Sequence, residues 1–237
     1  MGYVESQFSL PRWKQLTISR MTLYDDLYRN LPTMGWMFVP LTEYEGGGDH
    51  ATFDDHLQEI EWAFAQNLGA GTAACYRGNR LYDNSTATGQ AIRSVMRKWI
   101  DFYKLHRSIL IQPVIHLKRP TMHDWDGWLH VRPYKSRPSE NKFSFFKSPT
   151  GAQEEVGLAM IFNPTDRHLR ETLILPLYYT GLTDLVQVSL NDSPFFLAVI
   201  DRDYRLRIDL DMPKKSIHSV VLKDPSPMKS VEKVKYQ

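Results

Sequence analysis

The apolar positions in the first half of the chain follow three helical patterns. Residues 16–31 carry apolar side chains at helical spacing up to Pro32, and residues 53–68 form a second apolar face. The Gly-Ala-Gly stretch at 69–71 predicts the end of the second helix, because glycine adopts left-handed backbone angles without strain. A third and longer helix is predicted for residues 86–110 from its amphipathic spacing.

Two short apolar runs separate these helices. They read WMFVPL at 36–41 and TAACY at 72–76, and neither contains a charged side chain. Strands that are covered on both faces of a parallel sheet have this composition. Helix, strand, helix, strand, helix is the order of βα units, so residues 1–112 are predicted to form an α/β part with parallel strands.

The second half of the chain carries strand patterns without a helical period. In RLRIDLDM polar and apolar residues alternate strictly, which is typical of a strand with one wet face. An antiparallel β-sandwich is predicted for residues 113–222, with a long polar loop at 134–155, and residues 223–237 are predicted to be a disordered tail. The segments with strand patterns are PVIHLKRP, GWLHVRP, VGLAMIFNPT, ETLILPLYY, VQVSL, FFLAVIDRDY, RLRIDLDM and SIHSVVLK.

Composition excludes several classes of protein. The 237 residues are 42% hydrophobic, which is enough for the core of one or two domains. No run approaches the roughly 18 apolar residues of a membrane span, and the N-terminus lacks the pattern of a signal peptide. A formal net charge of +2 gives no reason to expect nucleic acid or an anionic membrane as a partner. Sequons at Asn84 and Asn191 are compatible with a secreted or extracellular parent protein.

No metal site and no cofactor is predicted. Cys75 is the single cysteine, which excludes an internal disulfide and a multi-cysteine metal site. His50 and His56 are not at the i, i+4 spacing of two zinc ligands on one helix. Asp124 and Asp126 lie in MHDWDGW, a stretch that is typical of a β-turn.

Two architectures combine a parallel α/β part with an antiparallel sandwich. A dinucleotide-binding domain requires G-x-G-x-x-G at its first strand–helix turn, and the glycine-rich stretches EGGGDH and GAGTAACYRG lack that order. A complete eight-fold (β/α) barrel needs about 250 residues, and residues 1–112 can supply about three of its units. The predicted fold class is therefore α/β followed by all-β, with a partial (β/α) barrel and an antiparallel β-sandwich.

Four segments carry a resemblance to a known type of protein: GWMFVPLTEYEGGG, LGAGTAACYRGNRLYD, WIDFYKLHRSILIQPVIHLKRP and GLAMIFNPTDRHLRETLILPLYYTGL. They resemble the C-terminal region of large glycoside-hydrolase-like proteins, and more broadly glycosidases of the α-galactosidase (melibiase) type, over about residues 1–222. In those proteins a catalytic barrel precedes a β-sandwich. The resemblance implies that residues 36–41 and 72–76 are the seventh and eighth barrel strands. It also implies that the nucleophilic carboxylate, on strand four, lies upstream of Met1.

Candidate catalytic carboxylates are Glu43 and Glu5. Glycoside hydrolysis generally uses two carboxyl groups, and in a barrel they emerge at the C-terminal ends of the strands. Glu43 lies just past the WMFVPL run and points into the barrel mouth if the strand continues through Thr42, whereas Glu45 is expected in the next loop. Glu5 becomes the second carboxylate if GYVES (2–6) is a strand end. The alternatives are a solvated loop glutamate for Glu43 and an ordinary polar terminus for Glu5.

Candidate substrate-binding residues follow the same two strands. Tyr44, Asp49 and His50 come after the first strand, and Asp49 and His50 can hydrogen-bond sugar hydroxyls. Tyr76 and Arg77 end the second strand, and the guanidinium of Arg77 suits bidentate contacts. Capping of the next helix by Asp49 and an ion pair of Arg77 within its own loop are equally open.

Two classes of function follow from these residues. The first is the C-terminal portion of a glycoside hydrolase-like protein that acts on carbohydrate, inactive alone if the missing barrel strands hold the nucleophile. The alternative is a non-catalytic carbohydrate-binding or structural interaction module. In either case a two-stranded parallel pair exposes an unpaired edge, which predicts self-association or a missing N-terminal barrel segment.

Overall fold

The computed structural model describes residues 13–14, 16–21, 36–40, 53–77, 87–134 and 155–225. Residues 13–14 and 16–21 are helical. Two long helices, α2 (Phe53–Gly69) and α3 (Ala87–Leu110), follow, together with the strands β1 (Trp36–Pro40) and β2 (Ala73–Arg77).

Both long helices occupy the residues that the apolar spacing predicted, to within one residue at each end. Along α3 the side chains of Ile92, Trp99 and Ile109 are buried, whereas those of Lys104 and Arg107 are exposed. Arg107 lies in the last turn, where a positive charge interacts favourably with the helix dipole. The helix predicted for 16–31 is helical over 16–21, and its other residues lie outside the described part of the chain.

The two apolar runs form a parallel strand pair. The register runs from Trp36 beside Ala73 to Pro40 beside Arg77, so both strands end at the same edge. Helix α2 connects them and packs against both. The βα order predicted from the sequence is confirmed for these elements, while the barrel itself stays a prediction.

The second half of the chain is an antiparallel β-sandwich, as predicted. Each of the predicted segments contains one strand, and every strand pair is antiparallel. Tyr178–Thr180 leave the strand pattern and form a short 3-10 helix, η3. The larger sheet has the order β3 (Val114–Lys118), β4 (Asp126–Val131), β5 (Glu155–Asn163), β10 (Ser216–Lys223), β7 (Leu185–Leu190), β8 (Phe196–Val199), and the smaller one pairs β6 (Leu169–Pro176) with β9 (Arg205–Met212).

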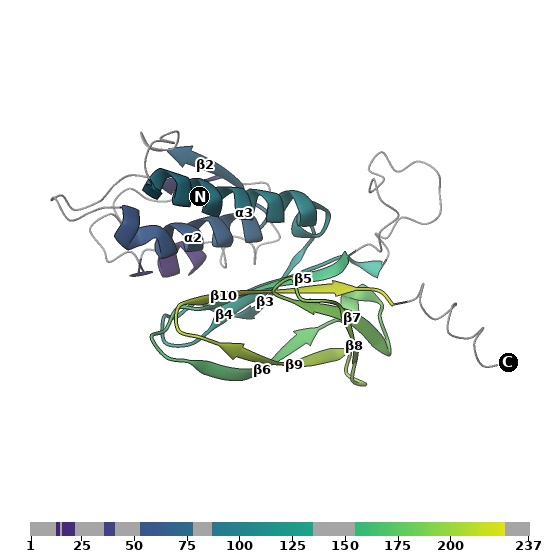
Figure 1. Cartoon of the computed structure of the whole chain (residues 1–237). Coiled ribbons are helices and arrows are strands. Elements are labelled where there is room, and N and C mark those ends of the chain that lie inside the picture. The colour runs from purple at the N-terminus through teal and green to yellow at the C-terminus, as the bar shows by residue number, and fades with distance from the viewer. Residues whose placement is uncertain are drawn as a thin grey trace, which may run out of the picture.

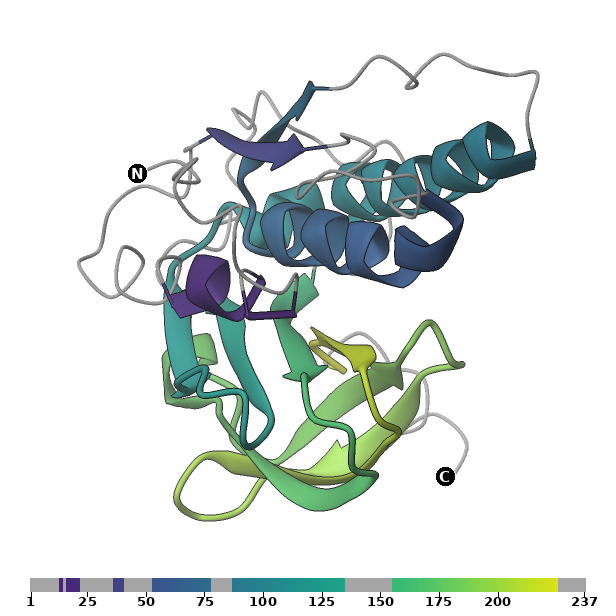
Figure 2. The same ribbon diagram turned by 90° about the vertical axis from the view of Figure 1, so that its left-hand side faces the viewer.

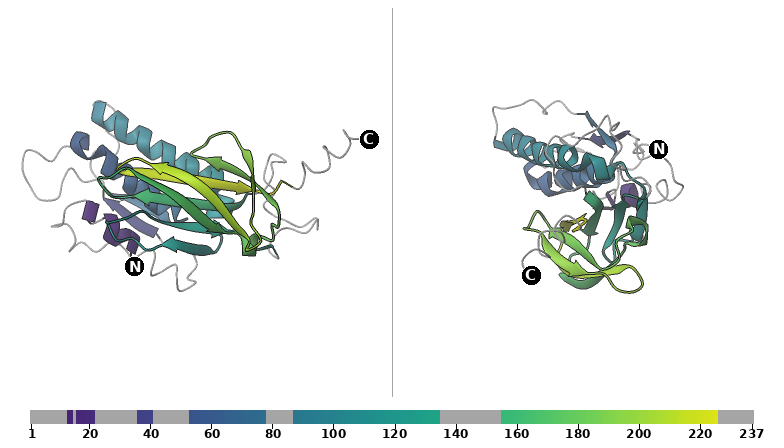
Figure 3. Two further views of the ribbon diagram at one scale, coloured as in Figure 1. Left: turned by 90° about the horizontal axis from the view of Figure 1, so that it is seen from below. Right: turned by 90° about the vertical axis from the view of Figure 1, so that its right-hand side faces the viewer.

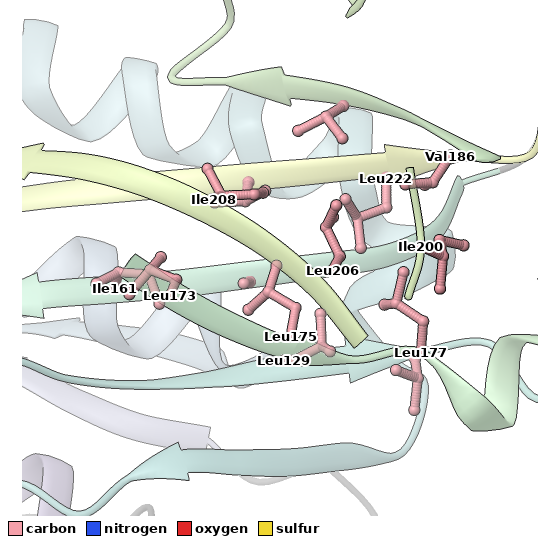
Figure 4. Close-up of a cluster of buried hydrophobic side chains, with 14 of the residues drawn as sticks. Leu129, Ile161, Leu173, Leu175, Leu177, Val186, Ile200, Leu206, Ile208 and Leu222 are labelled. Atoms are coloured by element: carbon pink, nitrogen blue, oxygen red, sulfur yellow. The ribbon is translucent and has the colours of Figure 1, made fainter. Parts of the chain in front are cut away.

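The six-stranded sheet is covered on both faces. From β5, Leu158, Met160 and Phe162 pack against the helices, while Ala159 and Ile161 face the two-stranded sheet. Figure 4 shows the second of these cores, where side chains from both sheets meet. Strand β9 keeps strict alternation of exposed and buried residues, which confirms its predicted wet face.

The elements are stacked in layers. The β1–β2 pair lies over α2 and α3, the helices lie over the six-stranded sheet, and the β6–β9 pair covers the sheet's other face (Figures 1 and 2). The right-hand view of Figure 3 shows the same order from the opposite side, and in the view from below the strands of the sandwich lie in front of the helices.

A buried ion pair joins the helical layer to the sandwich. Both hydrogen bonds from the Arg20 guanidinium to the Asp126 carboxylate are 2.8 Å long, and both side chains are fully buried. The guanidinium also lies over the rings of Trp62 and Phe162. Burial raises the pKa of the Asp126 carboxyl, while Arg20 acts in the opposite direction.

The β-turn predicted for MHDWDGW is wrong at its end, because Asp126 is the first residue of β4.

Candidate functional site

The carboxyl ends of β1 and β2 lie side by side. Val39 is beside Tyr76 and Pro40 is beside Arg77 in the parallel register. Polar residues that follow such ends converge on one edge of the sheet, which is where barrel enzymes place their active sites. The backbone therefore brings Tyr76 and Arg77 to the edge from which the segment containing Glu43 leaves β1.

The other predicted site residues lie outside the described part of the chain. They are Glu5, Glu43, Tyr44, Asp49 and His50. Their roles, and those of Tyr76 and Arg77, stay predictions. Among the described residues, no group of three or more His, Cys, Asp and Glu side chains is arranged to hold a metal ion.

The turn between α2 and β2 leads into the first residue of β2, at the opposite edge of the strand pair from Tyr76 and Arg77. Gly71 has a φ of 76°, and the amides of Gly71 and Thr72 donate to the carbonyl oxygens of Leu68 and Asn67. A Cβ on Gly71 would lie 2.1 Å from the Leu110 carbonyl oxygen at the end of α3. Only glycine fits this close approach, so the predicted left-handed stop at 69–71 is confirmed at Gly71.

A groove of about 520 Å³ lies between the helices and the sandwich. Helix α2 contributes Glu61 and Trp62, α3 contributes Trp99 and Phe102, and β10 contributes Ile217. No local sequence pattern indicates this groove, because residues of three separate elements, α2, α3 and β10, line it.

The polar side chains of the groove bind one another. Glu61 Oε1 accepts hydrogen bonds from Lys98 Nζ at 2.6 Å and from the Trp99 indole nitrogen at 3.2 Å. The Lys215 ammonium lies 4.5 Å from the centre of the Trp13 ring and 3.4 Å from Asp166 Oδ1. Glu61 is thereby committed to two donors, which suits a structural carboxylate better than a general acid or base.

Two histidines beside the groove have defined partners. His106 on α3 is 4% exposed, and its Nδ1 lies 2.8 Å from Glu155 Oε1 at the start of β5. His218 Nδ1 accepts a hydrogen bond from the Asn191 amide at 2.9 Å, and burial lowers the pKa of His218. The Asn191 side chain also accepts a bond from the Ser219 amide. These contacts give Asn191 a structural role at the turn after β7.

A third histidine is fully buried behind the groove. His130 Nε2 lies 3.0 Å from the Gly69 carbonyl oxygen, and Nδ1 lies 3.3 Å from that of Gln112. Burial lowers the pKa of His130 to about 4, so the ring is neutral at physiological pH. A neutral imidazole donates from one nitrogen, and His130 therefore ties the end of α2 to β4 as a structural group.

Comparison with known proteins gives a result at the level of fold. No protein-family model and no curated protein matches the chain. A solved GH27 β-L-arabinopyranosidase from Geobacillus stearothermophilus, in complex with arabinose, is 13% identical with a TM-score of 0.50, over 90% of this chain and 42% of that one. A GH36 α-galactosidase from the same organism, in complex with raffinose, is 14% identical with a TM-score of 0.50, over 87% of this chain and 24% of that one.

The structural neighbours of this chain are glycoside hydrolases. At these identities the likeness shows a shared fold alone. The chain spans less than half of the length of either neighbour. Within its described part, no helix is long and apolar enough to cross a membrane.

Proposed function

We propose that this chain is the C-terminal portion of a carbohydrate-active, glycoside hydrolase-like protein. In this proposal residues 1–112 form about the last three units of a (β/α) barrel, and residues 113–222 form its sandwich. The observation that carries the proposal is the order of the elements. A parallel strand pair with its intervening helix, followed by α3 and an antiparallel sandwich, shares its fold with a GH27 arabinopyranosidase over 90% of the chain.

The proposed chemistry is acid/base hydrolysis of a glycosidic bond. One carboxyl group protonates the leaving oxygen, and the other acts as nucleophile or as the base that activates water. Glu43 and Glu5 are the candidates for these roles. Tyr44, Asp49, His50, Tyr76 and Arg77 would hold the sugar by hydrogen bonds at the strand-end edge.

The proposed protein is incomplete as a barrel. Among the described residues the two parallel strands pair only with each other, and in this proposal their outer edges are covered by a missing N-terminal barrel segment or by another copy of the chain. If the nucleophile lies in that segment, the isolated chain binds carbohydrate without hydrolysing it.

The test is hydrolysis of a panel of nitrophenyl glycosides by the purified chain. Glu43→Gln is expected to lower turnover by at least about 100-fold, because general acid–base catalysis contributes that much. Glu45→Gln, two positions further along the chain, is the matched control and should retain turnover. Equal turnover by the Glu43 variant and the unchanged chain would remove Glu43 from the mechanism.

The alternative function is a non-catalytic carbohydrate-binding or structural interaction module. The observation that favours this alternative is that the chain spans only 42% and 24% of its two enzyme neighbours. Saturable binding of arabinose or raffinose without turnover, measured by saturation-transfer NMR, would support the binding module. If the chain shows no turnover and binds neither sugar, the result would favour the structural interaction module.

A further inference from the structure

Four tyrosines are exposed at one end of the sandwich. The exposed fractions are 63% for Tyr134, 66% for Tyr178, 60% for Tyr179 and 37% for Tyr204. They come from the segments after β4, after β6 and before β9. We call this group the tyrosine surface. Tyr178, Tyr179 and Tyr204 adjoin β6 and β9, the pair on the other side of the six-stranded sheet from β1 and β2 (Figure 1), so they are separate from the strand-end edge.

The rings are packed on one another in fixed orientations. Tyr178 meets Tyr179 with ring centres 5.5 Å apart and Tyr204 with centres 5.4 Å apart, both at 82°. The ring of Tyr134 lies so close to Gly181 that a Cβ there would be 2.6 Å from it. Edge-to-face packing of this kind holds the rings in place while it leaves ring surface open to solvent.

The backbone beneath the tyrosine surface is held by buried hydrogen bonds. The Thr180 side chain is fully buried, and its hydroxyl donates to the Leu177 carbonyl oxygen at 2.6 Å. The Leu177 amide donates to the Tyr204 carbonyl oxygen at 2.8 Å, which joins η3 to the turn before β9. The aromatic side chains are therefore displayed by a rigid support, which lowers the entropy lost on binding.

The backbone at Tyr204 is strained. Its φ is 58°, in the left-handed region where glycine and asparagine are favoured and an aromatic residue is rare. The Asp201 carboxylate stabilises this turn by accepting bonds from the amides of Asp203 and Arg205. A glycine at position 204 would complete the same turn with less strain. The Tyr204 ring packs on Tyr178, and strain at an exposed side chain is a ground for a functional hypothesis.

Charged side chains border the tyrosine surface. Asp203 and Arg205 flank Tyr204, with 3.9 Å between Arg205 Nη1 and Asp203 Oδ2, and both side chains are exposed. Carboxylate and guanidinium groups can each hydrogen-bond a pair of neighbouring hydroxyls. Exposed phenol rings beside such groups match the two kinds of surface on a sugar ring, its C–H face and its hydroxyl edge.

We propose that the tyrosine surface binds a glycan through Tyr178, Tyr179 and Tyr204. The proposal shares only its ligand class with the proposed function and needs no catalytic residue. Protein interfaces also use tyrosines, so a second copy of the chain is the other outcome of the test. The charged Asp203 and Arg205 beside the rings favour a glycan, because both groups can hydrogen-bond hydroxyls.

The experiment is native gel electrophoresis of the full chain in gels that contain galactomannan, arabinogalactan or mixed-linkage β-glucan. The unchanged chain should be retarded in at least one gel. Tyr178→Ala with Tyr179→Ala should weaken the retardation about tenfold or more, as expected for exposed aromatic anchors. Tyr204→Gly should weaken it as well while leaving the melting temperature equal or higher. Leu105→Ala, on the exposed side of α3, is the control and should be retarded normally.

Three results would overturn the proposal. The first is free migration of the unchanged chain in all three gels, and the second is equal retardation of the tyrosine variants. The third is loss of self-association in Tyr178→Ala/Tyr179→Ala, measured by analytical ultracentrifugation, with unaltered retardation; the surface would then bind a second copy. Tyr178→Ala/Tyr179→Ala should act on the nitrophenyl glycosides as the unchanged chain does, so a failure of hydrolysis and a failure of this surface are distinguishable.

Discussion

Among single residues, Arg20 makes the contacts with the largest consequence for stability. Its guanidinium satisfies both oxygens of a fully buried carboxylate and lies over two aromatic rings. Removal of one partner of such a pair leaves an uncompensated charge in a low-dielectric interior. No local sequence pattern indicates the pair, because Arg20 and Asp126 are 106 positions apart.

Arg20→Met should lower the free energy of unfolding by about 3–5 kcal/mol, because Asp126 then stays buried without its partner. Lys98→Met is the control, since it removes the Lys98–Glu61 pair, in which the lysine side chain is 63% exposed. That change should cost no more than about 1 kcal/mol. Urea denaturation measures both values. Equal losses of unfolding free energy in the two variants would show that the buried pair contributes no more to stability than the exposed pair.

Among the elements, the strands and helices follow the sequence closely. The strict alternation in RLRIDLDM forms a strand and the helical spacing in residues 86–110 forms a helix, as expected. In both cases the spacing of apolar residues along the chain decides which side chains share a face. The turn at 69–71 was predicted from glycine alone, but the contact that requires glycine is with the end of α3.

The two glycines of that turn differ in what replacement would cost. Gly71→Ala should lower the free energy of unfolding by at least about 2 kcal/mol, because φ is positive and the new Cβ would meet backbone. Gly69→Ala is the matched control, since Gly69 is helical and its Cβ would meet the Met160 side chain, with Cγ and Cε at 2.9 Å, rather than backbone. Thermal denaturation of both variants tests the difference. A larger loss at Gly69 than at Gly71 would contradict this account.

For the whole molecule, the helical layer and the sandwich share one hydrophobic core. Trp128, Met160 and Phe162 of the six-stranded sheet pack with Trp62 and Phe64 of α2. The sandwich therefore has an apolar outer face that the helices cover, although the sequence predicts it as a separate range at 113–222.

Residues 113–225 expressed alone should bind an apolar dye and self-associate, because Trp128, Met160 and Phe162 lose their covering helices. The control is the same fragment with these three residues changed to threonine, which should bind less dye. Dye fluorescence and sedimentation measure the effect. A monomeric fragment that binds no dye would show that the sandwich is independent of the helices.

The sequence by itself determined which residues form helices and strands, the parallel and antiparallel halves, and the edge from which the Glu43 segment leaves β1. Those properties depend on local spacing, which a single chain displays directly. Tertiary structure alone decided the buried Arg20–Asp126 pair, the groove and the tyrosine surface. Each of these brings together residues from distant segments, and their meeting depends on how the layers pack rather than on any local pattern.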